Sequence, residues 1–272
     1  MLKLRVITAL VLLPIVLAAL FLLERTAFAA VAGVFFLAAA WEWSALVGGL
    51  TRLLRVGYVA LMAVLLAAAE HYQPLWLFHW APLWWLLAAF WVLRYPRSTA
   101  LWSAAPVMAL IGVALLVPSF AVVVAVQDQG ALGLAGPWAL LFILFWVWAA
   151  DTGAYFAGRT LGKHKLAPAV SPGKTIEGLI GGVLLALVIV ALVHHFAPVQ
   201  AQLPKLLAVA LVTVLASVLG DLFESMVKRL RGVKDSGTML PGHGGMLDRI
   251  DSITAALPVA AMALLWAGLA GV

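Results

Sequence analysis

The feature that most constrains this chain is a series of apolar stretches, each long enough to cross a lipid bilayer as a helix. A membrane-spanning helix needs ~20 apolar residues. The 272-residue chain has nine stretches of about this length, at about residues 6–23, 27–47, 53–69, 75–93, 104–126, 136–157, 176–196, 204–224 and 252–272. They are continuously apolar, whereas the strands of a membrane barrel alternate apolar and polar residues. The sequence therefore predicts an all-α, polytopic integral membrane protein with about nine transmembrane helices.

The basic residues predict how these helices are oriented. If the N-terminus lies in the cytoplasm, 15 of the 17 Lys and Arg residues fall on the cytoplasmic side, and only Arg25 and Lys205 fall outside. Short loops rich in Lys and Arg remain on the cytoplasmic side of a membrane. We therefore expect a cytoplasmic N-terminus and a C-terminus on the opposite side.

The first apolar stretch also resembles a secretory signal, because Lys3 and Arg5 precede it and residues 27–29 look like a cleavage site. Its apolar run is longer than the ~7–15 residues of a signal core. In addition, Glu24 and Arg25 interrupt the approach to the cleavage site. We expect the stretch to be retained as the first helix. The chain has no cysteine, which excludes disulfides and thiolate metal sites.

Charged residues make up only 10% of the chain, and seven of the eleven Asp and Glu residues lie from Asp151 onward. We therefore expect a transmembrane scaffold at residues 1–135 and a catalytic transmembrane region at residues 136–272. Glu42, which lies between two tryptophans, is an exception in the first region. We interpret it as part of an interfacial aromatic belt, with its carboxylate in headgroup water. The alternative is a contact with a lipid headgroup.

Two polar segments stand out by their length, which is typical of functional connections. The first begins at Asp151, an ionisable residue within an apolar helix, where a charge is costly and indicates function. Ser171 is a candidate N-cap for the next helix, and Lys174 would offer a donor near its positive end. Residues 173–175 read Gly-Lys-Thr, but a P-loop needs a preceding strand and a glycine at position 168, where this chain has proline. We exclude the P-loop.

The second polar segment runs from Asp221 to Asp251 and holds five acids and five bases. Asp221, Glu224 and Ser225 are spaced three and four residues apart, so they project from one face of a helix. Asp248 and Asp251 repeat this spacing at the start of the last helix. Carboxylates at the ends of two helices suit a hard divalent cation with oxygen ligands, and Mg²⁺ is the natural candidate.

Between these acids, Pro241-Gly242 is typical of a turn, and Gly244 and Gly245 leave backbone N–H groups accessible before a helix N-terminus. Exposed amides and the helix dipole favour phosphate at such a position. His243 adds a side-chain donor. Each feature alone has an ordinary explanation, as loop glycines or surface ion pairs. Together with the acids and bases, they predict a nucleotide or polyphosphate site at the membrane surface.

Residues 225–251, SMVKRLRGVKDSGTMLPGHGGMLDRID, resemble the signature of the phosphatidate cytidylyltransferases, also called CDP-diacylglycerol synthases. The likeness includes the Lys-Arg, Lys-Asp, His-Gly-Gly and Asp-Arg-apolar-Asp positions, and it covers 27 of the 272 residues. DTGAYFAGR at 151–159 and SPGKTIEG at 171–178 resemble two further, less specific blocks of the family, in the expected order.

The resemblance implies transfer of CMP from CTP to phosphatidic acid, giving CDP-diacylglycerol and pyrophosphate for phospholipid biosynthesis, with a magnesium requirement. Together with the spacing, it indicates Asp221 and Asp248 as the principal metal ligands, and Glu224 and Asp251 as alternatives. The expected catalytic residues are Asp221, Asp248, Lys228, Arg229, Lys234 and Arg249. The expected substrate-binding residues are Asp151, Arg159, Ser171, Lys174, Ser225, His243, Gly244 and Gly245.

We expect CTP, phosphatidic acid and the lipid bilayer as partners, and no nucleic acid; a homodimer is also considered. The expected location is the inner (cytoplasmic) membrane, with the site facing the cytoplasm. Two alternatives stay open. One is a secondary transporter for an anionic solute, because intramembrane acids also build transporters, although the motif clusters near one membrane face. The other is a different CTP-dependent lipid enzyme, such as a polyprenol kinase or an archaeal-type lipid cytidylyltransferase.

Overall fold

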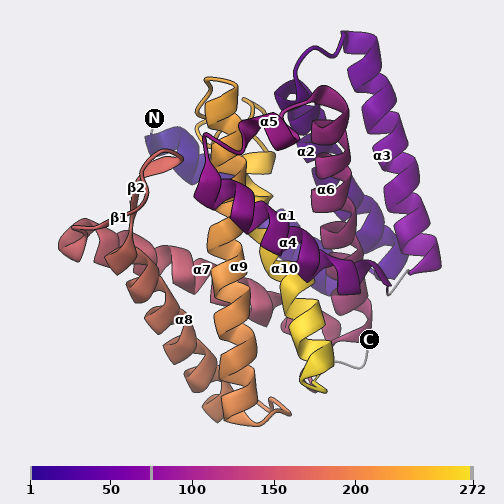
Figure 1. Ribbon diagram of the computed structural model, residues 1–272. Coiled ribbons are helices and arrows are strands. Elements are labelled where there is room, and N and C mark those ends of the chain that lie inside the picture. Colours follow the sequence, from indigo (N-terminus) through magenta and orange to yellow (C-terminus); the bar gives the residue numbers. More distant parts are fainter. Residues whose placement is uncertain (1, 74–75, 270–272) are drawn as a thin grey trace.

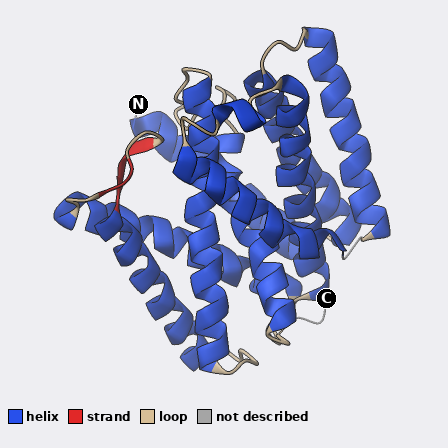
Figure 2. Ribbon diagram, in the orientation of Figure 1, coloured by secondary structure: helices blue, strands red, loops and turns tan. Residues whose placement is uncertain are grey.

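A computed structural model describes residues 2–73 and 76–269, and these form a bundle of helices with one small hairpin of strands (Figures 1 and 2). The elements, in chain order, are α1 (Leu2–Leu22), α2 (Arg25–Val47), α3 (Arg52–Tyr72), α4 (Trp76–Arg94), α5 (Thr99–Trp102), α6 (Ala105–Gln129), α7 (Gly136–Leu161), β1 (Lys165–Ala167), β2 (Ser171–Thr175), α8 (Ile176–Phe196), α9 (Leu203–Leu230) and α10 (Leu247–Trp266). The expectation of an all-α polytopic fold is confirmed.

Each of the nine predicted apolar stretches coincides with a long helix, but several helix ends differ from the prediction. Helix α9 continues to Leu230, so Lys228 and Arg229 are helical, and α10 begins at Leu247 instead of residue 252. The short α5 and the antiparallel hairpin of β1 and β2 were not predicted. The end of the last predicted stretch, residues 270–272, lies outside the described residues.

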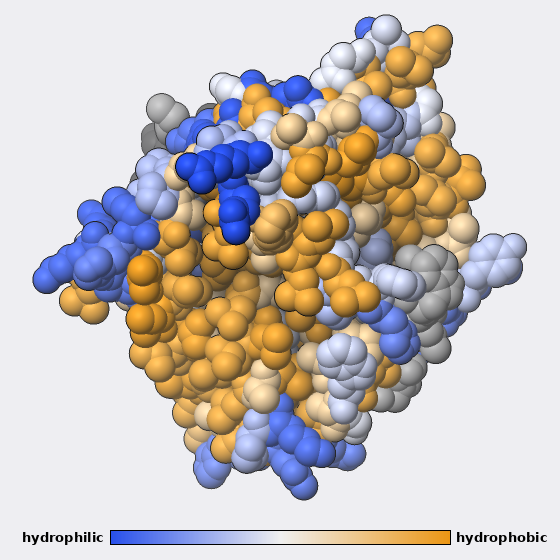
Figure 3. All heavy atoms as spheres, in the orientation of Figure 1, coloured by the Kyte–Doolittle hydropathy of each residue, from blue (hydrophilic) through white to orange (hydrophobic). Residues whose placement is uncertain are grey.

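Within the described residues, seven helices are long and apolar enough to cross a membrane: α2, α3, α6, α7, α8, α9 and α10. Helix α4 is not in this set, and neither is α1, whose shorter apolar part is Leu10–Leu22. Apolar residues cover most of the face seen in Figure 3, and hydrophilic residues gather toward its upper left and lower edges. The protein is therefore a multi-pass membrane protein, while the count of nine spans stays a prediction.

Small residues allow the helices of the second half to approach closely. A Cβ atom at Gly182 of α8 would collide with the carbonyl oxygen of Ala150 in α7, and one at Gly220 of α9 would collide with the carbonyl oxygen of Asp251 in α10. Close backbone approach at small residues is a common way for helices to associate in lipid. These two contacts place Asp151 next to α8 and bring Asp221 and Asp251 to adjacent helix positions.

The elements that carry the two polar segments lie toward one end of the bundle. In Figure 1 the N-terminus, the hairpin and the connection from α9 to α10 lie toward the upper end, and the C-terminus lies lower in the view. The hydroxyl of Thr8 in α1 also donates a hydrogen bond to the carbonyl oxygen of Pro241, at 2.9 Å. This arrangement supports a shared side for the N-terminus and the polar segments, and the compartment they face stays a prediction.

We predict that this shared side is cytoplasmic. Because the native chain has no cysteine, single cysteines report topology without background. Thr238→Cys in the exposed connection before α10 should resist a membrane-impermeant maleimide added outside intact cells and react after permeabilisation. Gln202→Cys, in the exposed connection before α9, is the matched control and should react without permeabilisation. Labelling of Thr238→Cys from outside would contradict the orientation.

Candidate active site

Asp151 of the first polar segment and most of the acids and bases of the second meet around one cavity at the end of the bundle, which we call the charged cavity. Its volume is about 380 Å³. Its lining comes from α7, α9, α10 and the connection between the last two, and consists of Asp151, Asp221, Ser225, Lys228, Arg229, Lys234, Asp235, Asp248, Arg249, Asp251 and Ser252. All six residues expected to be catalytic therefore line the same space.

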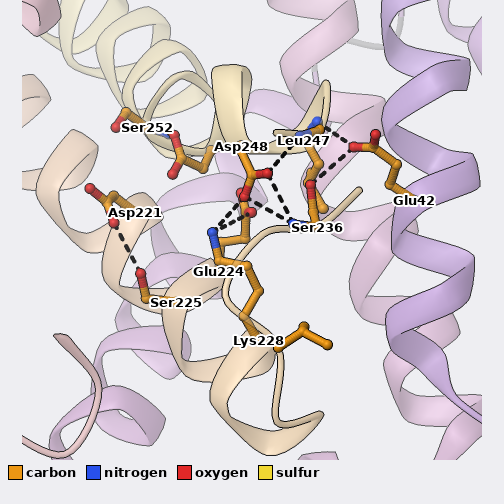
Figure 4. Close-up of polar contacts among 12 residues, drawn as sticks. Glu42, Asp221, Glu224, Ser225, Lys228, Ser236, Leu247, Asp248 and Ser252 are labelled. Atoms are coloured by element: carbon orange, nitrogen blue, oxygen red, sulfur yellow. Dashed lines mark hydrogen bonds and ion pairs between the residues drawn. The ribbon is translucent and has the colours of Figure 1, made fainter. Parts of the chain in front are cut away.

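A nearly buried ion pair joins α9 to α10 beside this cavity (Figure 4). The Lys228 ammonium lies 2.7 Å from Asp248 Oδ1 and 3.0 Å from Glu224 Oε1, and the three side chains are 9%, 7% and 4% exposed. Asp248 also accepts hydrogen bonds from the backbone N–H groups of Ser236 and Gly245, at 2.9 and 2.8 Å. Asp248 is therefore the point at which α9, α10 and their connection meet.

A second ion pair brings the hairpin to the same site. The Lys174 ammonium of β2 lies 2.7 Å from Asp221 Oδ2, and the Ser225 hydroxyl donates to Asp221 Oδ1 at 3.2 Å. The Arg229 Nε–H donates to the carbonyl oxygen of Val170, in the hairpin turn, at 3.2 Å. Segments that are about 50 residues apart in sequence thus share one cluster of charges.

A second cavity, which we call the hairpin cavity, adjoins the first. It has a volume of about 510 Å³ and lies among α7, the hairpin, α8 and α9. Asp151 and Asp221 line both cavities, and Arg159 and Lys174 line the hairpin cavity. The structure therefore brings three predicted substrate-binding residues of the first segment, Asp151, Arg159 and Lys174, next to the predicted metal ligands of the second.

Four predicted substrate-binding residues line neither cavity: Ser171, His243, Gly244 and Gly245. The expectation that Ser171 caps the following helix is wrong, because Ser171 lies in β2 and the α8 N-cap is Thr175, whose hydroxyl accepts from Gly178 N–H at 3.1 Å. A role for Ser171 in binding substrate stays a prediction.

In the turn before α10, the backbone conformation and the packing of the loop require the two glycines. Gly244 has a φ of +85°, in the left-handed region that favours glycine. A Cβ atom at Gly245 would collide with the Ser236 hydroxyl and the Glu42 carboxylate. The N–H of Gly245 already donates to Asp248. A larger residue at either glycine is thus expected to disturb the loop, and phosphate binding by these amides stays a prediction.

Glu42 contributes to the site and was missed by the sequence interpretation. It is only 3% exposed, so the expected place in headgroup water is wrong. From α2 its Oε2 atom accepts hydrogen bonds from the Ser236 hydroxyl at 3.0 Å and from Leu247 N–H at 2.8 Å (Figure 4). Leu247 is the first residue of α10, whose early N–H groups have no partner within the helix. Glu42 therefore holds the start of α10 from the other half of the chain.

Arg231 forms a second link between α2 and the end of α9. Its guanidinium donates to the carbonyl oxygens of Leu46, at 2.6 Å, and of Val47. These carbonyl groups are at the C-terminal end of α2, where they lack partners within the helix and where the helix dipole favours a cation. Glu42 and Arg231 together fix α2 against the start of α10 and the end of α9, the two helices that carry five of the six predicted catalytic residues.

The acids also fit a divalent cation. Within residues 2–73 and 76–269, no three acidic or histidine side chains converge as a preformed metal site, since ammonium groups lie between the carboxylates. However, Asp221, Asp248 and Asp251 line one cavity, and within the described residues the Oε2 atom of the buried Glu224 has neither a hydrogen-bond nor an ion-pair partner, while its Oε1 atom faces Lys228. Oxygen ligands of this kind match Mg²⁺.

The apolar helices and the charged cavity define a membrane-embedded protein with a cluster of charged residues at one end of its bundle. The chain belongs to the cytidylyltransferase family, whose model matches residues 3–266. A phosphatidate cytidylyltransferase of Pseudomonas aeruginosa is 47% identical over 272 residues, which cover 98% of each chain. One from Haemophilus influenzae is 40% identical over 279 residues, covering 95% of this chain and 96% of the relative.

A shorter match to a third relative has a similar identity. A phosphatidate cytidylyltransferase of Staphylococcus epidermidis is 49% identical over 120 residues, 44% of this chain and 46% of the relative. Membership of an enzyme family favours the enzyme over the transporter that the sequence left open.

We predict that Glu42 is needed to hold the site in place. Glu42→Ala should lower stability in detergent by about 1–3 kcal/mol, because it leaves the buried Leu247 N–H without a partner. Glu42→Gln keeps a carbonyl acceptor and should retain most of the stability and turnover. Thermal unfolding and turnover are measured on the same preparations. Equal behaviour of Glu42→Ala and the native protein would contradict this role.

Proposed function

We propose that this protein transfers CMP from CTP to phosphatidic acid at the charged cavity, giving CDP-diacylglycerol and pyrophosphate. The observation that carries the proposal is the position of residues 225–251. This motif resembles the signature of the phosphatidate cytidylyltransferases, and its Asp, Lys and Arg side chains, except Arg231, line one cavity together with Asp151. The names of relatives that match nearly the whole chain support the same activity.

The reaction is a nucleotidyl transfer. A phosphate oxygen of phosphatidic acid attacks the α-phosphorus of CTP, a new P–O bond forms, and the bond from the α-phosphorus to the bridging oxygen breaks, so that pyrophosphate leaves. A phosphate monoester carries about −1.5 to −2 charges at neutral pH. The nucleophile is therefore already ionised and needs little help from a general base. The main obstacle is repulsion between two anions.

The basic side chains of the site reduce this repulsion between the two anions. Lys228, Arg229, Lys234 and Arg249 line the charged cavity, and Lys174 and Arg159 line the hairpin cavity beside it. Fixed cations at the position where charge develops stabilise a phosphoryl-transfer transition state. We assign these residues to the triphosphate, to the departing pyrophosphate and to the lipid phosphate. The chain thus works mainly by positioning and charge neutralisation.

The acids would hold Mg²⁺, with Asp221 and Asp248 as the principal ligands and Glu224 and Asp251 as alternatives. A bound magnesium ion would neutralise charge on the triphosphate and orient it. Asp221 is the more accessible of the two principal ligands, since its side chain is 30% exposed and that of Asp248 is 7% exposed. Asp221 therefore offers the cleaner test of metal binding.

We place the protein in the inner membrane with the charged cavity facing the cytoplasm, as the basic loops favour. The homodimer considered from the sequence stays a prediction.

The proposed activity is tested with purified protein, Mg²⁺, vesicles that contain phosphatidic acid, and CTP labelled in its α-phosphate or, in a parallel reaction, in its γ-phosphate. We expect the α label, and not the γ label, in a lipid product, with one pyrophosphate for each labelled lipid. Vesicles with diacylglycerol or a polyprenol in place of phosphatidic acid should give no labelled product. Transfer of the γ-phosphate, or no labelled lipid with phosphatidic acid, would contradict the proposal.

Within this assay, Asp221→Asn should lower turnover roughly 100-fold or more and raise the magnesium concentration needed for half-maximal activity, because it removes a ligand charge. Glu224→Gln should have a smaller effect on magnesium. The matched control is Asp128→Asn, which removes the charge of an acid that pairs with Arg25 away from the cavity. Normal turnover of Asp221→Asn at limiting magnesium would remove Asp221 from the metal site.

A further inference from the structure

An apolar groove lies on the other side of α10 from the charged cavity. Its volume is about 300 Å³, and its walls come from α1, α2, α6, α7, α10 and the connection before α10. Side chains that line it include Leu12 and Val16 of α1, Phe36 of α2, and Trp148 of α7. Apart from Arg249, no residue that the proposed chemistry uses lines this groove.

Helix α10 lies between the groove and the charged cavity, and its two faces differ in character. One face carries Asp248, Asp251 and Ser252 into the charged cavity. The other face carries a stripe with helical spacing into the apolar groove: Arg249, Ile250, Ile253 and Leu257. Arg249 lines both spaces. The groove therefore meets the charged cavity at a single cation.

Arg249 is free to bind an anion at this junction. Its side chain is exposed, and within the described part of the chain its guanidinium has no hydrogen-bond or ion-pair partner. Lys174 and Lys228, in contrast, are both paired with acids. A guanidinium is well suited to phosphate because its fork of N–H donors matches the phosphate oxygens.

We infer that the apolar groove holds an acyl chain of phosphatidic acid and that Arg249 binds the lipid phosphate at its mouth. This inference rests on the proposed function. An acyl chain is stabilised by apolar walls, whereas the phosphate of the same molecule has to reach the nucleotide among the charged residues. The groove and the cavity provide these two environments side by side, with a cation between them.

The other large spaces fit an acyl chain less well. The hairpin cavity is lined by several charged side chains, among them Asp151, Arg159 and Lys174. An apolar groove of about 280 Å³ between α2, α3 and α6 shares no residue with the charged cavity. Along α10 the proposed groove extends from Arg249 to Leu257, eight residues or about 12 Å of helix. The groove would thus cover the part of the acyl chain nearest the headgroup.

The first test locates the acyl chain on the native protein. Phosphatidic acid with a photoreactive diazirine in one acyl chain is added in phosphatidylcholine vesicles, and labelled peptides are identified by mass spectrometry. We expect label on α1 and α10 that is reduced by excess unlabelled phosphatidic acid and not by phosphatidylcholine. Competed labelling near Tyr155 and Leu179 of the hairpin cavity, or labelling of all helices without competition, would overturn the inference.

The second test fills the groove. Val16→Trp places a large side chain into it at a partly exposed position of α1, and Val188→Trp on the exposed face of α8 is the matched control. Val16→Trp should raise KM for phosphatidic acid roughly fivefold or more and leave KM for CTP unchanged. An unchanged KM for phosphatidic acid in a folded Val16→Trp protein would contradict the groove.

The two proposals fail in different ways. Normal turnover of phosphatidic acid with label outside the groove would reject the groove and leave the proposed function intact. Absence of any CTP-dependent product from phosphatidic acid would reject the proposed function, and the lipid assignment of the groove with it.

Discussion

The structure depends on the ammonium group of Lys228, which is almost completely withdrawn from solvent between Glu224 and Asp248. A charge is costly to bury, and removing one partner of a buried ion pair costs about 3–5 kcal/mol because the other charge stays unpaired. Asp248 shares its carboxylate between this ammonium and two backbone N–H groups of the connection before α10. The same interaction therefore ties α9 to α10 and shapes the connection that carries Arg231 and Lys234.

Backbone approach and electrostatics act together to build the site. Gly220 lets α9 lie directly against α10, and Gly182 lets α8 lie directly against α7. These contacts, which stabilise helix pairs in any membrane protein, also bring charged residues of four elements to one end of the bundle. The lipid-facing surface needs no charge, and nine of the 17 charged residues between residues 136 and 272 line the charged cavity. For a reaction between two anions, such a concentration of fixed cations and acids is the main requirement.

Much of this arrangement follows from the sequence, because the determining signals are local. The apolar stretches predicted the long helices. The three-and-four spacing predicted that Asp221 and Glu224 would share a face of one helix, that Asp248 and Asp251 would share a face of the next, and that the two helix ends would form one site. The contacts of Glu42 with Ser236 and Leu247 could not be predicted, since they join residues about 200 positions apart and no local pattern encodes such a pairing. The hairpin was missed because both strands are short and β2 contains proline and glycine. The helix cap is Thr175 instead of Ser171, because Ser171 lies in β2. The one signal for Glu42 in the sequence was an acidic residue within an apolar helix.

The organising role of the Lys228 ion pair is tested most directly by a double-mutant cycle on stability in detergent. Lys228→Met, Asp248→Asn and the double variant are compared with the native protein by thermal or denaturant unfolding. If the two side chains stabilise each other, each single change should be strongly destabilising, and the double change should cost less than their sum by about 0.5–3 kcal/mol. Additive effects of the two substitutions would contradict the account, because they would show that Lys228 and Asp248 do not act as one interaction.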